Sequence, residues 1–328
     1  MDKCILVPLD GSALAEMALP HAVALARTMS KELILVRVVP MPLAYNQAIW
    51  GAPVPTSVWE ISEEEAKSAR EHLARTAEKL DHLNIEVHTQ VLEGDPAAMI
   101  IAYAEQHPRV ATIAMSTHGR SGLGRWFFGS VAEKVLQAAP VPLLLVRAAE
   151  SESARAPRAL DEARYDTILV PLDGSPLAEL AVEPAQHIAA TTGAKLILIS
   201  AVVGPPVVPE LITSAEERTL WDQEIEWQSS YLGEVKARLL AEGLEADSRV
   251  VSQPPAEAIV QMSERGHADL IVMSTHGRGG LQRLWLGSVA IKVVRGTGLP
   301  VLLVRAKERV ASPELQHQAA PLALLANV

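Results

Sequence analysis

Two long segments of this chain each occur twice, and this repeat limits the fold more than any other feature of the sequence. VPLDGS at residues 7–12 returns at residues 170–175, and MSTHGRSGLGRWFFGSVAEKV at residues 115–135 returns as MSTHGRGGLQRLWLGSVAIKV at residues 273–293. A repeat distance of about 160 residues indicates a duplicated domain and not a solenoid of short units. The length of 328 residues agrees with two domains.

Each copy alternates short apolar runs with longer helical patterns. Strands that are apolar along most of their length are typical of a parallel sheet covered on both faces by helices. The sequence therefore predicts an α/β fold with two tandem Rossmann-like domains, each a five-stranded parallel sheet flanked by helices. The expected strands are CILVPL, ELILVRVV, EVHTQVL, VATIAMS and VPLLLVR in the first copy and TILVPL, KLILISAVV, ADSRVVS, ADLIVMS and LPVLLVR in the second. Helices are expected in the first copy at residues 14–28, 62–83, 96–106 and 129–137.

A polar segment rich in Ala, Arg, Glu and Ser separates the copies and sets the expected domain boundaries. We expect domain 1 at residues 1–148, a linker at 149–164, domain 2 at 165–306 and a C-terminal tail at 307–328. A long Pro-rich apolar segment follows the second strand of each copy. Each segment could cover a ligand or dock a partner, or it could pack its tryptophans, Trp50, Trp59 and Trp221, on its own domain.

Charge and composition argue against several classes of partner. With 29 basic and 39 acidic residues, the formal net charge is −10, which argues against broad electrostatic binding of nucleic acid or an anionic membrane. No apolar run approaches the roughly 18 to 20 residues of a membrane span, and the N-terminus carries no export signal. Cys4 is the single cysteine, so no intrachain disulfide can form. We therefore expect a cytoplasmic protein.

The repeated motifs fall where open parallel α/β sheets bind ligands, beyond the carboxyl ends of strands at the point where the strand order reverses. Asp10 follows strand one and residues 116–119 follow strand four, so a reversal between these strands brings them together over one crevice. Gly129 and Ser130 begin the next helix, whose N-terminal amides and macrodipole favour an anion. The second copy repeats this arrangement with Asp173, residues 274–277, Gly287 and Ser288.

Asp10 allows two interpretations. Its carboxylate could accept hydrogen bonds from ribose hydroxyls or help to hold a phosphate-bound cation. Alternatively, Asp10 or Ser12 caps the helix that starts at about Leu14. We favour the ligand-binding role because the aspartate accompanies a Gly-rich loop in both copies.

These motifs resemble those of the universal stress protein family, whose ATP-binding members carry Gly, two residues, Gly, nine residues, and Gly-Ser or Gly-Thr. Gly119 and Gly129-Ser130 have this spacing in the first copy, and Gly277 and Gly287-Ser288 have it in the second. The resemblance covers nearly the whole chain. One departure weakens the inference of ATP binding, because serine replaces the first glycine of the pattern in both copies, at Ser116 and Ser274.

The resemblance implies an adenine nucleotide in each copy, with ATP accompanied by Mg²⁺ as the cofactor. It implies adenine at the end of strand two, ribose at the aspartate, and phosphates at the Gly-rich loop and the following helix. The scattered histidines form no recognised motif for a structural metal. The predicted nucleotide-binding residues are Pro8, Asp10, Gly11, Ser12, Val38, Val39, Met115, Ser116, His118, Gly119, Arg120, Gly129, Ser130 and Val131, then Pro171, Asp173, Gly174, Ser175, Ala201, Val202, Met273, Ser274, His276, Gly277, Arg278, Gly287, Ser288 and Val289.

The copies differ near this predicted site. After strand three the first has Gly94-Asp95-Pro96, whereas the second has the stiffer Gln253-Pro254-Pro255. If one site has lost nucleotide, we expect it to be the second. The pair Gly279-Gly280, which replaces Ser121-Gly122, points the other way because it makes the second phosphate loop more permissive.

No complete catalytic constellation accompanies the motifs. His118 and His276 can exchange protons near neutral pH, but no nucleophile stands at a recognisable spacing. The chain also lacks GxxxxGK[ST] and a GxGxxG after strand one. We therefore predict a nucleotide-binding regulatory protein of the stress response, in which ATP occupancy modulates conformation or assembly. Slow ATP hydrolysis, or an interaction protein that has lost nucleotide binding and docks a partner protein through its Pro-rich segments, remains as an alternative.

The family resemblance also points to the last strands, at residues 141–147 and 300–305, as the edges through which the two copies pair. We expect two tandem chains to associate further into a homodimer.

Overall fold

The computed structural model describes residues 3–29, 32–40, 56–117, 128–147, 159–204, 215–264, 268–277 and 287–305. Its strands are β1 (Cys4–Pro8), β2 (Glu32–Val39), β3 (Val87–Glu93), β4 (Val110–Ser116), β5 (Leu143–Val146), β6 (Thr167–Pro171), β7 (Lys195–Ala201), β8 (Ala246–Val251), β9 (Leu270–Ser274) and β10 (Val301–Val304). Its helices are α1 (Ala13–Glu16), α2 (Leu19–Met29), α4 (Thr56–Glu78), the 3₁₀ turn η1 (Asp81–Leu83), α5 (Pro96–Gln106), α6 (Ser130–Ala138), α7 (Pro176–Glu179), α8 (Val182–Thr192), α9 (Ala215–Ala241), α10 (Pro255–Glu264) and α11 (Ser288–Gly296). Within these ranges, no helix is both long enough and apolar enough to cross a bilayer.

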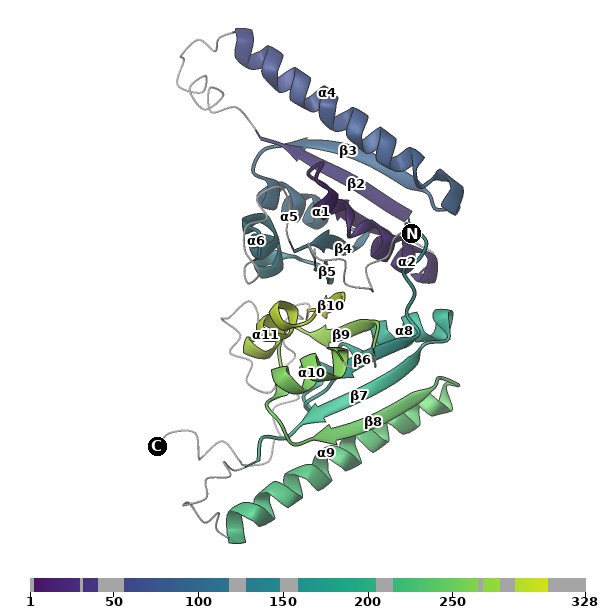
Figure 1. Ribbon diagram of the computed structural model, residues 1–328, viewed down its shortest axis with the longest axis vertical. Coiled ribbons are helices and arrows are strands. Elements are labelled where there is room, and N and C mark those ends of the chain that lie inside the picture. The colour runs from purple at the N-terminus through teal and green to yellow at the C-terminus, as the bar shows by residue number, and fades with distance from the viewer. Residues whose placement is uncertain are drawn as a thin grey trace.

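The strands form one ten-stranded sheet in the order β3-β2-β1-β4-β5-β10-β9-β6-β7-β8 (Figure 1). All neighbouring strands are parallel except β5 and β10, which are antiparallel, with Leu143 opposite Leu303. The predicted fold class is therefore confirmed, with five parallel strands in each half. The expected pairing of the last strands is confirmed as well, because β5 and β10 join the halves edge to edge.

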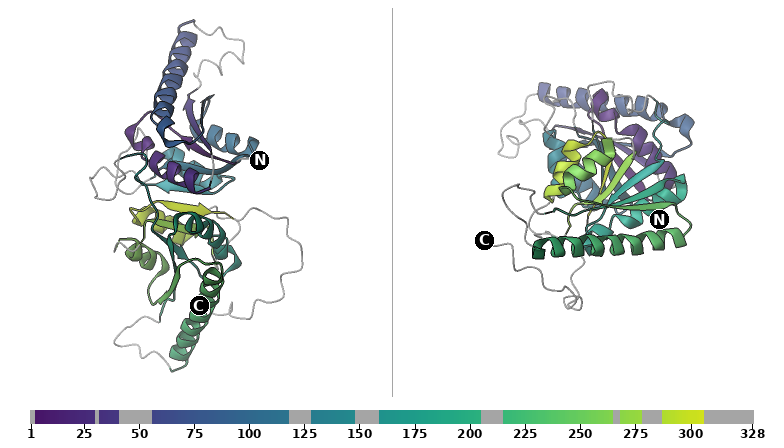
Figure 2. Two further views of the ribbon diagram at one scale, coloured as in Figure 1. Left: turned by 90° about the vertical axis from the view of Figure 1, so that its right-hand side faces the viewer. Right: turned by 60° about the horizontal axis from the view of Figure 1, so that its bottom comes forward.

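The sheet is buried on both faces, which explains why its strands are apolar along their length. Ile5 and Val7 of β1 pack in a cluster with α1, α2 and α4, whereas Cys4 and Leu6 pack in a second cluster with α5 and α6. Both clusters continue into the second half, so the two halves share one core on each face. The long helices α4 and α9 lie at opposite ends of the molecule (Figure 2).

Two helices differ from the sequence-based expectation. The helix expected at residues 14–28 is divided into α1 and α2, and Pro20 stands in the first turn of α2, where a missing N–H breaks no intrahelical bond. The helix expected at residues 62–83 begins earlier, at Thr56, and ends at Glu78 before η1. The end of the first Pro-rich segment is therefore helical.

The tryptophans of the Pro-rich segments can be followed only in part. Trp221 lies in α9 and contacts Gly204 of its own half, which agrees with packing on its own domain. Trp50 and the side chain of Trp59 lie outside the described residues.

Each half also supplies an arginine to the last helix of the other half. Arg147, after β5, donates hydrogen bonds to the carbonyl oxygens of Arg295 at 3.3 Å and Thr297 at 3.1 Å, at the end of α11. Arg305, after β10, donates to the carbonyl oxygen of Ala139 at 3.2 Å, at the end of α6. A cation at a helix C-terminus is favoured by the helix dipole, so these contacts help to hold the halves together.

Candidate functional site

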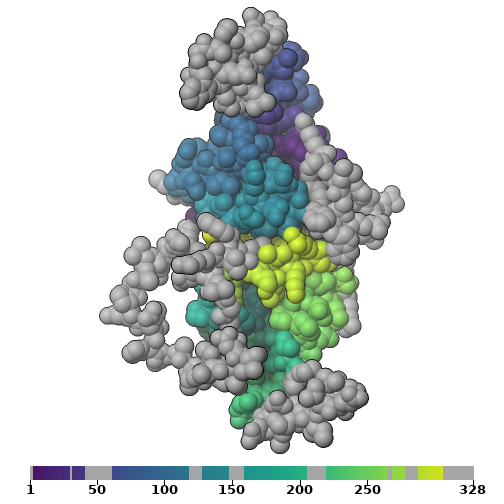
Figure 3. Space-filling view, turned by 90° about the vertical axis from the view of Figure 1, so that its left-hand side faces the viewer, coloured from purple at the N-terminus to yellow at the C-terminus, as the bar shows by residue number. Residues whose placement is uncertain are grey.

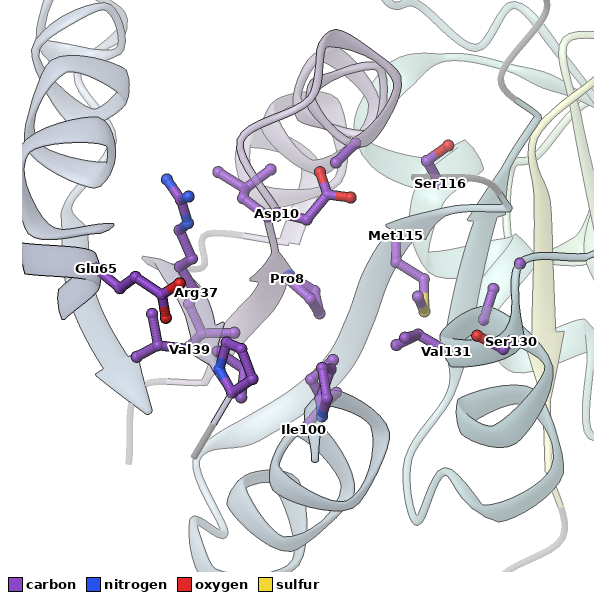
Figure 4. Close-up of a pocket in the computed structure, with 18 of the residues that line it drawn as sticks. Pro8, Asp10, Arg37, Val39, Glu65, Ile100, Met115, Ser116, Ser130 and Val131 are labelled. Atoms are coloured by element: carbon purple, nitrogen blue, oxygen red, sulfur yellow. The ribbon is translucent and has the colours of Figure 1, made fainter. Parts of the chain in front are cut away.

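A cavity of about 630 Å³ opens in the first half where the strand order reverses between β1 and β4. As predicted, this reversal brings Asp10 and the end of β4 to one crevice. In Figure 4, Val39 lies on one side of the cavity and Ser130 on the other, with Asp10 between them. The predicted residues that line it are Pro8, Asp10, Val38, Val39, Met115, Ser116, Gly129, Ser130 and Val131. Its volume lies in the range of about 300 to 1,000 Å³ found for small-molecule sites.

In the loop after β1, the polar residues Asp10 and Ser12 have different hydrogen-bonding roles. Ser12 Oγ accepts a hydrogen bond from the amide of Ala15 at 3.2 Å and so caps α1. Asp10 Oδ1 accepts bonds from the amide of Ser12 at 2.9 Å and from its hydroxyl at 2.6 Å. Gly11 between them has a φ of 86°, a conformation that favours glycine. Ser12 is therefore the cap, and Asp10 holds the cap while its carboxylate faces the cavity (Figure 4).

The second half builds the same loop. Asp173 Oδ1 accepts bonds from the amide of Ser175 at 3.0 Å and its hydroxyl at 2.6 Å, Ser175 caps α7, and Gly174 has a φ of 79°. A Cβ built on Gly277 would overlap Asp173 Oδ2. The aspartate and the start of the Gly-rich loop thus meet in the second half, as predicted.

The start of α6 lines the cavity with Gly129, Ser130 and Val131. Gly129 is the N-cap, makes no side-chain capping bond, and donates its own amide to the carbonyl oxygen of Thr117 at 2.9 Å. Gly287 does the same at α11, with a 2.8 Å bond to Thr275. A Cβ on Gly287 would lie 2.8 Å from that same oxygen, so the turn requires glycine. Amides left uncapped at a helix N-terminus can bind an anion.

The remaining predicted residues of the second half occupy equivalent positions. They are Pro171 at the end of β6, Ala201 and Val202 at the end of β7, Met273 and Ser274 at the end of β9, and Ser288 and Val289 at the start of α11. His276 follows β9, and its Nδ1 lies 3.0 Å from the hydroxyl oxygen of Thr275. His118, Gly119, Arg120 and Arg278, together with Ser121-Gly122 and Gly279-Gly280, lie outside the described residues.

Charged side chains at one end of the cavity were missed by the sequence analysis. Arg37 of β2 lines the cavity together with Glu64 and Glu65 of α4 (Figure 4). The signal for Arg37 was its charge within the otherwise apolar run ELILVRVV. The two glutamates gave no such signal, because charged residues are common along a helix.

The second half has a different set of polar side chains at the equivalent end of its sheet. Ser200 stands on β7 where Arg37 stands on β2, and its hydroxyl donates to Oε1 of the buried Gln228 at 2.8 Å. Gln228 Nε2 donates in turn to Glu224 at 3.1 Å and to the carbonyl oxygen of Asp173 at 3.4 Å. At the strand position where the first half has an arginine, the second half therefore has a neutral hydroxyl that is bonded to a buried amide.

The turn after β3 differs between the halves, as the sequence indicated. Asp95 caps α5 by accepting the amide of Ala98 at 3.0 Å, and its other oxygen lies 3.4 Å from Lys134 of α6. The Ala98 amide bond, aided by Lys134, lowers the pKa of Asp95. Gly94 has a φ of 138°, whereas the second half has Pro254 before α10.

One group of potential metal ligands lies elsewhere among the described residues. Glu32, Glu86 and His88 hold their ligand atoms within 4.8 Å of one another. Arg109 forms an ion pair with Glu32, and His88 lies 3.1 Å from Glu86. These residues therefore form a surface ion-pair cluster, and we assign no ion to it.

Comparison with known proteins agrees with this fold and crevice. The sequence profile of the universal stress protein family matches residues 1–147 and 164–305. A universal stress protein, Rv2005c of Mycobacterium tuberculosis, is 27% identical over 271 residues, which cover 80% of this chain and 82% of that protein. The crystal structure of a universal stress protein from Archaeoglobus fulgidus matches with a TM-score of 0.66 and 22% identity, over 92% of this chain and 98% of that one.

The fold and the repeated motif residues define a tandem α/β protein built from two copies of one domain. The chain belongs to the universal stress protein family, with two copies of the family domain. The crystal structure of one universal stress protein in complex with cAMP is also similar to part of this chain. That protein is 30% identical and matches 43% of this chain and 98% of its own, with a TM-score of 0.33.

Proposed function

We propose that this protein binds an adenine nucleotide in the crevice of its first half, and that occupancy regulates its conformation or assembly. The observation that carries the proposal is the cavity of about 630 Å³ that joins Asp10 to the amides at the start of α6. A cavity with a hydrogen-bond acceptor near its centre and an anion-binding helix end at one side suits a nucleoside phosphate.

The proposed roles follow from the position of each wall. The adenine lies against Val38 and Val39, whose side chains give that end its apolar surface. Asp10 accepts hydrogen bonds from the ribose hydroxyls. Gly129 and Ser130 receive the phosphates, with Gly119 and Arg120 of the preceding loop completing their coordination. ATP brings Mg²⁺ with it in this proposal, and the protein supplies no structural metal.

The second half carries the equivalent residues, and we propose a second nucleotide site there. Gly277 beside Asp173 and the uncapped start of α11 support it. The Gln228 side chain and the proline turn distinguish this crevice from the first, so the two sites are expected to differ in affinity.

Binding, and not turnover, is the proposed activity. A bound nucleotide changes an equilibrium between two states only if it binds one of them more tightly. Slow hydrolysis is the enzymatic alternative, and it would appear as phosphate release that stops in Asp10→Ala. We further propose a cytoplasmic protein that forms homodimers, with domain boundaries at residues 148 and 165.

An interaction protein without nucleotide is the second candidate. Ser116 and Ser274 favour it, because these buried serines stand where the ATP-binding pattern has glycine. The apolar side chains of Ile61 and Leu220, which are exposed on α4 and α9, could then contact a partner protein.

The deciding experiment is to purify the protein, denature it, and identify and count the released nucleotide by chromatography and mass spectrometry. The same count is made for Asp10→Asn and Asp173→Asn, with the exposed Asp161→Asn as the matched control. We expect up to two nucleotides per chain, with each crevice variant losing its own. A chain that carries no nucleotide and binds none from added ATP and Mg²⁺ would favour the interaction protein.

A further inference from the structure

The turn that leads into α6 is in contact with the other half of the molecule. Phe128 immediately precedes Gly129, the residue that opens α6 at the wall of the cavity. The guanidinium carbon of Arg295 lies 5.4 Å from the centre of the Phe128 ring. This distance is within the range of a cation–π interaction. Arg295 belongs to the last turn of α11, so the second half reaches the edge of the first crevice.

The same end of α11 is fixed to the first half by further contacts. Arg147 donates to the carbonyl oxygens of Arg295 and Thr297, which holds the backbone that carries the Arg295 side chain. Arg305 of the second half meets the opposite end of α6, at Ala139. The second half therefore touches α6 near its start and at its end. Figure 3 shows the surfaces of these two regions, teal and yellow, directly against each other.

Only one of the two symmetry-equivalent residue pairs can form this cation–π interaction. Gln137 occupies in α6 the position that Arg295 occupies in α11, and Leu286 occupies the position of Phe128. Glutamine carries no charge and leucine has no aromatic face, so this pair cannot form a cation–π interaction. The first half thus has a cation–π contact from its partner half that the residue types at the equivalent positions of the second half cannot form.

We propose that Arg295 is a positioning residue for the phosphate end of the first crevice. By holding the Phe128 ring, it fixes the turn at Gly129 and aims the first amides of α6 at the ligand. Phosphate affinity in the first half then depends on how the second half is docked. Conversely, a bound phosphate stabilises that docking, because coupling between two binding events is reciprocal. This inference rests on the nucleotide-binding function proposed above.

The test measures binding of ATP with Mg²⁺, and separately of adenosine, by calorimetry. All proteins carry Asp173→Ala so that the heat reports the first crevice. We expect Arg295→Gln to weaken ATP binding about two- to fivefold and to leave adenosine binding unchanged, because adenosine has no phosphate. Phe128→Leu should have the same effect, and the double variant should be no weaker than either single variant. Arg249→Gln, an exposed arginine on β8, is the matched control and should bind as the parent does.

Three outcomes would count against this inference. Unchanged ATP binding by Arg295→Gln, in a parent that binds ATP, would overturn it and leave the proposed function intact. Equal losses for ATP and adenosine would assign Arg295 a general structural role and would also overturn it. A protein without Asp173→Ala that binds no ATP would overturn the proposed function itself, and this inference with it.

Discussion

Nδ1 of His21 lies 3.2 Å from the phenolic oxygen of Tyr165, and both side chains are buried where the two halves meet. The rings are stacked, with centroids 6.1 Å apart. His21 belongs to α2, which packs against α8, and Tyr165 lies just before β6. Burial lowers the pKa of His21 to about 4, because a charged imidazole would lose its hydration there. This contact between the halves therefore contains a neutral histidine at neutral pH.

The buried histidine predicts a loss of stability in acid. The folded pKa of about 4 lies below the ordinary value of 6.5, so between these values the unfolded chain binds more protons than the folded one. The contribution of His21 to the free energy of unfolding is therefore fully present above pH 6.5. It decreases as the pH falls towards 4, by at most about 3 kcal/mol. Urea unfolding across this window should show that decrease in the wild type. A smaller decrease is expected in His21→Gln, and parallel pH profiles for the two proteins would contradict the assignment.

Gly287→Ala should damage the start of α11. The added Cβ would lie 2.8 Å from the carbonyl oxygen of Thr275, a backbone atom that cannot move away without shifting the turn. We expect the free energy of unfolding to fall by about 1 to 3 kcal/mol and nucleotide binding in the second half to weaken. Gly298→Ala is the control, because no atom beyond its two chain neighbours lies within 4 Å of its added Cβ. If thermal unfolding and ATP titration do not distinguish the two variants, the turn tolerates a side chain.

The repeat and the apolar strands were sufficient to predict the sheet and the place of the crevice. Strand ends and Gly-rich turns can be located from the local sequence. The strand reversal that is typical of open parallel sheets then brings Asp10 beside the end of β4. The charged wall formed by Arg37 and Glu65 was not predicted. Which side of α4 faces the cavity depends on how that helix packs across β2. The charged residues of α4 do not indicate this packing in the sequence, so their place at the cavity could not be predicted.

The differences between the halves were also hidden from the motifs. The motif residues repeat almost unchanged, but Gln228 belongs to α9, which lies outside the motifs. Its position can be compared with the first half only after the strand registers of the two halves are known. The division of the first expected helix into α1 and α2 did have a signal in the sequence, because Pro20 in the middle of one continuous helix would lack the N–H for an intrahelical bond.

Gln228→Ala tests the hydrogen-bond network of the second half. Removal of this buried amide leaves the buried Ser200 hydroxyl without its acceptor, which we expect to lower the free energy of unfolding by about 1 to 3 kcal/mol. The bond to the Asp173 carbonyl oxygen is lost as well, so nucleotide binding in the second half should change. Gln261→Ala on the exposed face of α10 should leave both quantities near the wild-type values. Equal stability of the two variants would show that the network contributes nothing measurable.

Arg147→Gln should loosen the junction between the halves. The variant removes hydrogen bonds from a guanidinium to carbonyl oxygens at the end of α11, in a setting that is only partly buried. We expect the free energy of unfolding in low salt to fall by about 1 kcal/mol. Because salt screens the attraction between the cation and the helix dipole, the difference from wild type should shrink in high salt. Arg305→Gln removes the reciprocal contact at α6 and should behave alike, whereas an unchanged salt dependence in both variants would mean that these arginines act by packing alone.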